Sequence, residues 1–137
     1  MTASPSGPFR ILIVDDEPVV RRFAARALLE QGFQVVEALD GAEALRLVRE
    51  GSVVPDAVVS DMVMPRLNGV ELLQALAVSH PRLPVLLISG YANAQLEGMG
   101  IAAPCAMLPK PFSVDQLVEE IRRCLREADP LSVSRTG

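Results

Sequence analysis

Hydrophobic residues along the chain alternate between short continuous runs and longer stretches in which they recur every three or four positions. Short runs bounded by polar residues are typical of buried strands, and the wider spacing is typical of amphipathic helices. We interpret five runs as strands, at residues 10–14, 34–38, 56–60, 85–89 and 105–108. Strands that alternate with helices predict an α/β fold, a doubly wound five-stranded parallel sheet in the order 2-1-3-4-5.

Capping signals indicate where most of the connecting helices begin and end. The first helix is expected between Pro18, in its first turn, and Gly32, with Val20, Phe23, Ala24, Ala27 and Leu28 on its apolar face. The later helices are expected to follow Asp40, Asn68 and Ser113, each of which has Glu or Gln three residues further on.

The last two helical regions differ in how strongly the sequence predicts them. Residues 91–104 contain two glycines and end in Pro104, which predicts one or two turns of helix followed by irregular chain. The final helix is expected to bury Val114, Leu117, Val118, Ile121 and Leu125.

Length and composition indicate one domain. The chain has 137 residues, of which 50% are hydrophobic, so it can bury a core of its own. We expect this domain at residues 9–127, with disordered tails at 1–8 and 128–137. The net charge of -4, the lack of a basic cluster and the lack of a long apolar run argue against nucleic-acid and membrane partners and favour a cytoplasmic protein. Cys105 and Cys124 form no CxxC or zinc-type pattern, so two reduced thiols are expected.

Three carboxylates are predicted to meet at one edge of the sheet. Asp15 and Asp16 follow the first strand and Asp61 follows the third, and in this strand order those two strands flank the crevice where ligands bind. Any one of them could be an ordinary turn residue, and Asp16 could cap the first helix. Together they repel one another unless a pKa rises or a hard cation binds, which favours Mg²⁺, with Mn²⁺ as an alternative.

Ser89 and Lys110 follow the fourth and fifth strands and bring a hydroxyl and an ammonium group to the same edge. A cation, a lysine, a hydroxyl and a carboxylate nucleophile suit phosphoryl transfer, in which charge neutralisation and alignment dominate. Asp61 is the best candidate for the nucleophile.

The motifs VDDEP, SDMVMPRLNG, LLISGYA and LPKPF occur in that order, and the set resembles the receiver domain of two-component response regulators, of the chemotaxis-receiver-like kind with a flavodoxin-like fold. The resemblance covers about residues 9–127, and the SGYA segment resembles receivers of hybrid histidine kinases. It implies that Asp61 accepts a phosphoryl group from a histidine kinase or phosphotransfer protein. It also implies Mg²⁺ ligation by Asp16, Asp61 and the Val63 carbonyl, with Asp15 acting through water.

The resemblance further implies that Ser89 and Lys110 contact the phosphoryl group and that the Lys110–Pro111 bond is cis. The position that usually holds an aromatic switch residue is occupied by Met107, whose flexible thioether makes a poorer two-state switch. By the same resemblance, Val63 and Tyr91 occupy the positions that flank the path of a hydrolysing water. An apolar Val63 cannot orient that water, which predicts slow self-dephosphorylation.

Three functions are therefore compared. The leading one is a phosphorylation-dependent signalling switch that changes a face for an unidentified downstream protein and is not an enzyme. The second is a constitutive protein-binding module whose switch is degenerate, which Met107 favours. The third is a phosphohydrolase with an aspartyl intermediate, but Val63 stands where such enzymes need a second aspartate.

Overall fold

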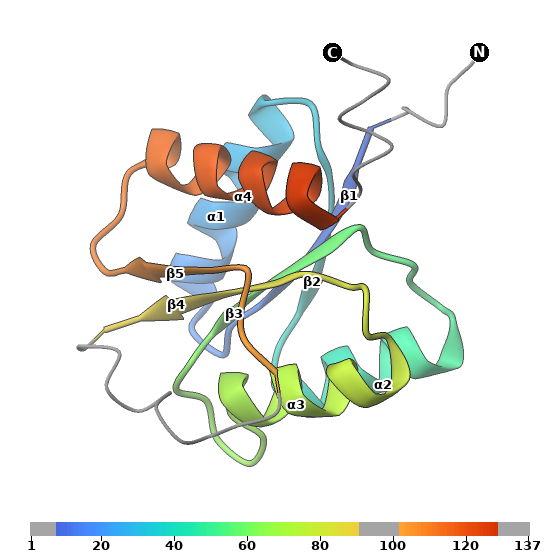
Figure 1. The fold of residues 1–137 in the computed structure, drawn as a ribbon. Coiled ribbons are helices and arrows are strands. Elements are labelled where there is room, and N and C mark those ends of the chain that lie inside the picture. The colour runs from blue at the N-terminus through green and yellow to red at the C-terminus, as the bar shows by residue number, and fades with distance from the viewer. Residues whose placement is uncertain (1–7, 91–101, 129–137) are drawn as a thin grey trace.

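The computed structural model describes residues 8–90 and 102–128, and it contains a five-stranded parallel sheet in the order β2-β1-β3-β4-β5 (Figure 1). Its strands are β1 (Arg10–Val14), β2 (Gln34–Ala38), β3 (Ala57–Asp61), β4 (Val85–Ser89) and β5 (Ala106–Pro109). The predicted fold class and strand order are confirmed. β3 and β5 each begin and end one residue later than the sequence pattern indicated.

Helices cover both faces of the sheet. They are α1 (Pro18–Glu30), α2 (Gly41–Glu50), α3 (Gly69–Ser79) and α4 (Val114–Ala128). α1 and α4 lie together on one face, and α2 and α3 lie on the other (Figure 1). Successive residues of a strand point to opposite faces, so Ile11 and Ile13 join the core beneath α1 and α4 while Leu12 and Val14 join the core beneath α2 and α3.

The predicted caps of three helices are confirmed. Asp40 accepts a hydrogen bond from the Glu43 N–H at the start of α2, and Gly51 ends that helix in the left-handed conformation. Asn68 and Glu71 form a reciprocal capping box on α3. Ser113 and Gln116 form the same pair of bonds before α4. These local signals fix the helix starts because each cap satisfies backbone N–H groups that the helix cannot pair.

The prediction for the apolar face of α1 was wrong at Phe23. The ring is 45% exposed, whereas Arg21 is buried at 6%. The helix is turned so that Arg21 reaches Glu37 on β2, and Phe23 lies at the edge of the face against Phe112. The alternative role of Asp16 as the cap of α1 is also not observed, because the capping position is Glu17 and it has no side-chain cap.

The expectation of two reduced thiols was wrong, since Cys105 and Cys124 form a disulfide. Their Cα atoms are 5.5 Å apart, although 19 positions separate them in the sequence. The pairing arises because the start of β5 packs against the inner face of α4, which spacing along the chain does not reveal. One or two turns of helix followed by irregular chain were expected in residues 91–104, and positions 91–101 of that segment, including Tyr91, lie outside the described residues. Most of both expected tails lie outside them as well. Among the described helices, none has the length and apolar character needed to cross a membrane.

Candidate functional site

The ends of two neighbouring strands bring three carboxylates together. β1 pairs with β3 in parallel, so Asp15 and Asp16, which follow β1, lie beside Asp61, the last residue of β3. One oxygen from each of the three carboxylates can be chosen so that all lie within 4.8 Å of one another. The structure thus brings together the three acidic residues that the sequence placed at the switch point of the sheet.

Burial makes the charged form of two of these carboxylates costly. Asp15 is 2% exposed and Asp61 is 6% exposed, while Asp16 is open to solvent. Burial raises the pKa of the Asp15 carboxyl to about 6, with a smaller increase from the charge of Asp61. Burial also raises the pKa of Asp61 above its ordinary value, and the nearby Lys110 opposes this rise.

The hydrogen bonds of Asp15 leave one acceptor for a cation. Its Oδ1 accepts a bond from the Glu17 N–H at 2.9 Å. Its Oδ2 is buried and has no hydrogen-bond partner among the residues that the structure describes. A buried carboxylate oxygen without a donor is costly, and three clustered carboxylates with only oxygen ligands fit a hard divalent cation.

Two further groups predicted from the sequence lie at the same edge. The Lys110 Nζ is 3.5 Å from Asp61 Oδ2. The backbone N–H of Lys110 donates to the carbonyl of Ser89 at 2.8 Å, and Ser89 is buried. The Lys110–Pro111 bond is cis, as expected. β4 and β5 therefore hold a hydroxyl and an ammonium group beside the carboxylates.

The remaining predicted positions differ in their surroundings. Val63 follows β3, its side chain is 67% exposed, and its N–H donates to Asp61 Oδ1 at 3.5 Å. Met107 lies on β5, partly buried against the core beneath α2 and α3. Tyr91 is outside the described part of the chain.

Arg21 is a supporting residue that the sequence analysis missed. Its Nη1 donates to the carbonyl of Asp15 at 2.9 Å, and its Nε is paired with Glu37 at 2.8 Å. The guanidinium therefore ties the end of β1 to β2 and fixes the backbone that carries Asp15. Little in the sequence indicates that Arg21 is buried. Arg21 adjoins Arg22, and two consecutive arginines on a helix are usually expected to be exposed to solvent.

Gly69 is required where α3 starts beneath the site. A Cβ at this position would collide with the carbonyl oxygen of Asp61 and lie 2.9 Å from the Met62 Cα. We expect Gly69→Ala to lower the free energy of unfolding by about 1 to 3 kcal/mol, because rigid backbone must move. Urea unfolding tests this, with Gly90→Ala as the control because no atom of the described residues lies within 4 Å of its Cβ position. Equal stability of the two variants would contradict it.

The sequence is similar to known proteins over most of its length. The sequence profile of the response regulator receiver domain matches residues 11–122. The chain is 40% identical over 125 residues to the sensor kinase CckA of Brucella abortus (strain 2308), covering 90% of this chain and 13% of that protein. It is 39% identical over 124 residues to the response regulator MprA of Mycobacterium sp. (strain KMS), covering 90% of this chain and 53% of that protein.

Solved structures agree with the sequence matches. The receiver domain of the hybrid histidine kinase CckA superposes with a TM-score of 0.69 at 38% identity, covering 85% of this chain and 98% of that one. The response regulator TrrA of Thermotoga maritima, solved with Mg²⁺ and BeF, gives a TM-score of 0.75 at 29% identity, with 85% and 98% coverage. The chain belongs to the response regulator receiver domain family, whose members are phosphoacceptor signalling modules rather than enzymes. Receivers of this family use Mg²⁺ and partner with histidine kinases.

Proposed function

We propose that Asp61 is the phosphoacceptor of this receiver domain. The observation that carries the proposal is the position of its buried carboxylate, with Lys110 Nζ at 3.5 Å and the two other carboxylates within 4.8 Å. A carboxylate attacks a phosphoryl group only where its own repulsion from that group is offset, and Lys110 supplies one positive charge for this purpose. Of the three carboxylates, Asp61 is the one within ion-pair distance of Lys110, so Asp15 and Asp16 are assigned to cation binding.

The same residues would hold Mg²⁺. Asp16, Asp61 and the Val63 carbonyl are proposed as direct ligands, and Asp15 as a ligand through water. The orphaned Asp15 Oδ2 supports this assignment. When bound, the ion would neutralise charge between the carboxylates and the incoming phosphoryl oxygens.

The proposed reaction is transfer of a phosphoryl group from a phosphohistidine. An Asp61 oxygen forms a bond to phosphorus as the phosphorus–nitrogen bond of the donor breaks, and the electron pair returns to the imidazole. Lys110 and the Ser89 hydroxyl would contact the phosphoryl oxygens. The donor would be a histidine kinase or a phosphotransfer protein, and the altered surface would then bind a downstream protein.

Labelling with acetyl phosphate tests the proposal directly. The protein and its Asp61→Asn variant are incubated with acetyl phosphate, with and without Mg²⁺, and their intact masses are recorded. We expect one phosphoryl adduct on the unmodified protein that needs Mg²⁺, and none on Asp61→Asn. An adduct that also forms on Asp61→Asn would mean that another residue is the phosphoacceptor. No adduct on either protein would favour the constitutive binding module.

The decay of that adduct tests the proposed role of Val63. Because its exposed apolar side chain cannot orient a water, we expect a lifetime of minutes rather than seconds. Val63→Asn should shorten the lifetime several-fold by supplying a hydrogen-bonding group. Val78→Asn is the matched control, since Val78 is 79% exposed on α3. A lifetime of seconds in the unmodified protein, or equal lifetimes in both variants, would contradict this role.

A further inference from the structure

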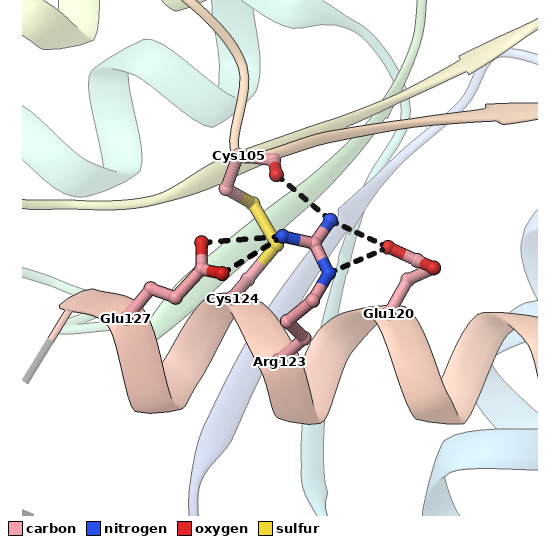
Figure 2. The surroundings of a disulfide bond; sticks show 5 residues. All are labelled: Cys105, Glu120, Arg123, Cys124 and Glu127. Carbon is pink, nitrogen blue, oxygen red and sulfur yellow. Dashed lines mark hydrogen bonds and ion pairs between the residues drawn. A yellow bond between two sulfur atoms is a disulfide. The ribbon is translucent and has the colours of Figure 1, made fainter. Parts of the chain in front are cut away.

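A second reactive group lies at the edge of the sheet opposite the carboxylates. Cys105 comes directly before β5, and Cys124 lies on α4. Their disulfide joins the edge strand to the last helix, as Figure 2 shows. Asp61 and Lys110 lie at the other ends of their strands, so this group plays no part in the phosphoryl site.

The two cysteines differ in exposure. Cys124 is 1% exposed and belongs to the core beneath α1 and α4, whereas Cys105 is only partly buried. An open groove of about 510 Å³ runs over the pair, with Arg82, Pro84 and Glu127 among its lining residues. Both cysteines line this groove, and because Cys105 is the more exposed residue, we expect a small thiol or disulfide to reach it first.

Contacts that do not involve sulfur fix the Cys105 backbone to β4 on one side and to α4 on the other. Its N–H donates to the Val85 carbonyl at 2.9 Å, and its carbonyl accepts a bond from Arg123 Nη2 at 3.1 Å. Arg123 is itself fixed by Glu120 at 2.6 Å and Glu127 at 3.0 Å (Figure 2). These contacts do not depend on the sulfur–sulfur bond, so we expect them to keep the two thiols close after reduction and to allow the bond to form again.

We propose that Cys105 and Cys124 form a reversible thiol–disulfide site that exchanges with small thiols and disulfides of the glutathione class. In oxidation, the Cys105 thiolate attacks glutathione disulfide, forms a mixed disulfide and releases one glutathione thiolate. The Cys124 thiolate then attacks the Cys105 sulfur and releases the second. Two electrons pass from the protein sulfurs to glutathione, and reduction follows the same steps in reverse.

Arg123 has a positioning role in this site. Its charge is balanced by two carboxylates, so it acts by holding the Cys105 backbone near Cys124 rather than by attracting a thiolate. Arg82 lines the groove, and its guanidinium is available to pair with a carboxylate of glutathione.

Single-cysteine variants test the proposed order of attack. The reduced protein, Cys124→Ser and Cys105→Ser are each treated with glutathione disulfide, and their intact masses are recorded. We expect closure to the disulfide in the unmodified protein, one glutathione adduct on Cys124→Ser, and an adduct that forms at least tenfold more slowly on Cys105→Ser, because Cys124 is buried. Equal rates of adduct formation on the two variants would overturn the assigned roles.

Equilibration with mixtures of reduced and oxidised glutathione tests reversibility. We expect the disulfide to open at the reducing end, and the reduced protein to remain folded with a Tm lower by about 10 °C. A bond that never forms, that never opens in the folded protein, or whose opening unfolds the chain would overturn the proposal. Asp61→Asn should behave as the unmodified protein does, so this test is independent of the phosphoryl chemistry.

Replacement of Arg123 tests the positioning role. With Arg123→Ala, we expect the ratio of disulfide to dithiol at a fixed glutathione composition to fall several-fold, because Cys105 is no longer held against α4. Arg126→Ala removes the same charge from an exposed position three residues further along α4 and should leave the ratio unchanged. Equal ratios in the two variants would overturn the role of Arg123.

Discussion

Replacing Asp15 with asparagine is expected to weaken Mg²⁺ binding by about 10- to 100-fold at pH 8, the range typical for a residue that orients a metal site from its second shell. The amide keeps the carbonyl that accepts the Glu17 N–H, but it removes the negative charge of the buried Oδ2. Titration with Mg²⁺ by calorimetry measures the effect. Glu119→Gln, an exposed carboxylate-to-amide change on α4, is the matched control.

The same substitution is expected to stabilise the metal-free protein at pH 8. The folded protein holds Asp15 at a pKa of about 6, above the ordinary aspartate value of 3.8. The folded state therefore binds a proton more tightly than the unfolded state, so stability falls as the pH rises from about 4 to about 6. The difference corresponds to at most about 3 kcal/mol, which Asp15→Asn should recover at pH 8 and not at pH 4.

Urea unfolding at both pH values without divalent cations checks this sign. In the unmodified protein, Mg²⁺ should stabilise more at pH 8 than at pH 5, because binding at pH 5 must displace the Asp15 proton. A variant that is less stable than the unmodified protein at pH 8 would show that Asp15 is held by contacts stronger than the cost of its burial. An unchanged Mg²⁺ affinity of Asp15→Asn would show that Asp15 is not part of the metal site.

The parts of the fold that follow from local sequence could be predicted closely. The bounds of β1, β2 and β4 agree with their apolar runs, and the capping box of α3 was visible as Asn68 followed by Glu71. Both are short-range signals, because a strand end or a cap depends on neighbours a few positions away. The meeting of Asp15 with Asp61 was also predictable, since the strand order alone makes β1 and β3 neighbours.

The features that were missed depend on contacts distant in the sequence. The apolar spacing of α1 includes Phe23, which is exposed in the structure. That spacing cannot show that Arg21 bonds to Glu37 on β2 and is therefore buried on the inner face of the helix. The pairing of Cys105 with Cys124 requires the packing of β5 against α4. The need for glycine at position 69 appears only when the Asp61 carbonyl is seen beside it.

Arg21 gives the last prediction, because it joins the fold to the site. The side chain is 8% exposed and bridges Glu37 and the Asp15 carbonyl. Arg21→Met keeps the aliphatic packing but leaves that buried carbonyl without this donor, and it breaks the ion pair with Glu37. Since Glu37 is 37% exposed and can be solvated, we expect a loss of about 2 to 3 kcal/mol of unfolding free energy, less than for a fully buried pair.

Arg21→Lys separates charge from geometry. Lysine keeps the positive charge but lacks the planar fork that reaches Nε and Nη1 partners at once, so we expect a loss of about 1 kcal/mol. Arg22→Met, at the exposed neighbouring position, should change stability by less than about 0.5 kcal/mol. Urea unfolding of the three variants measures this series. Full recovery with lysine would mean that the charge alone matters, whereas equal losses at positions 21 and 22 would mean that the bridge to Asp15 contributes nothing.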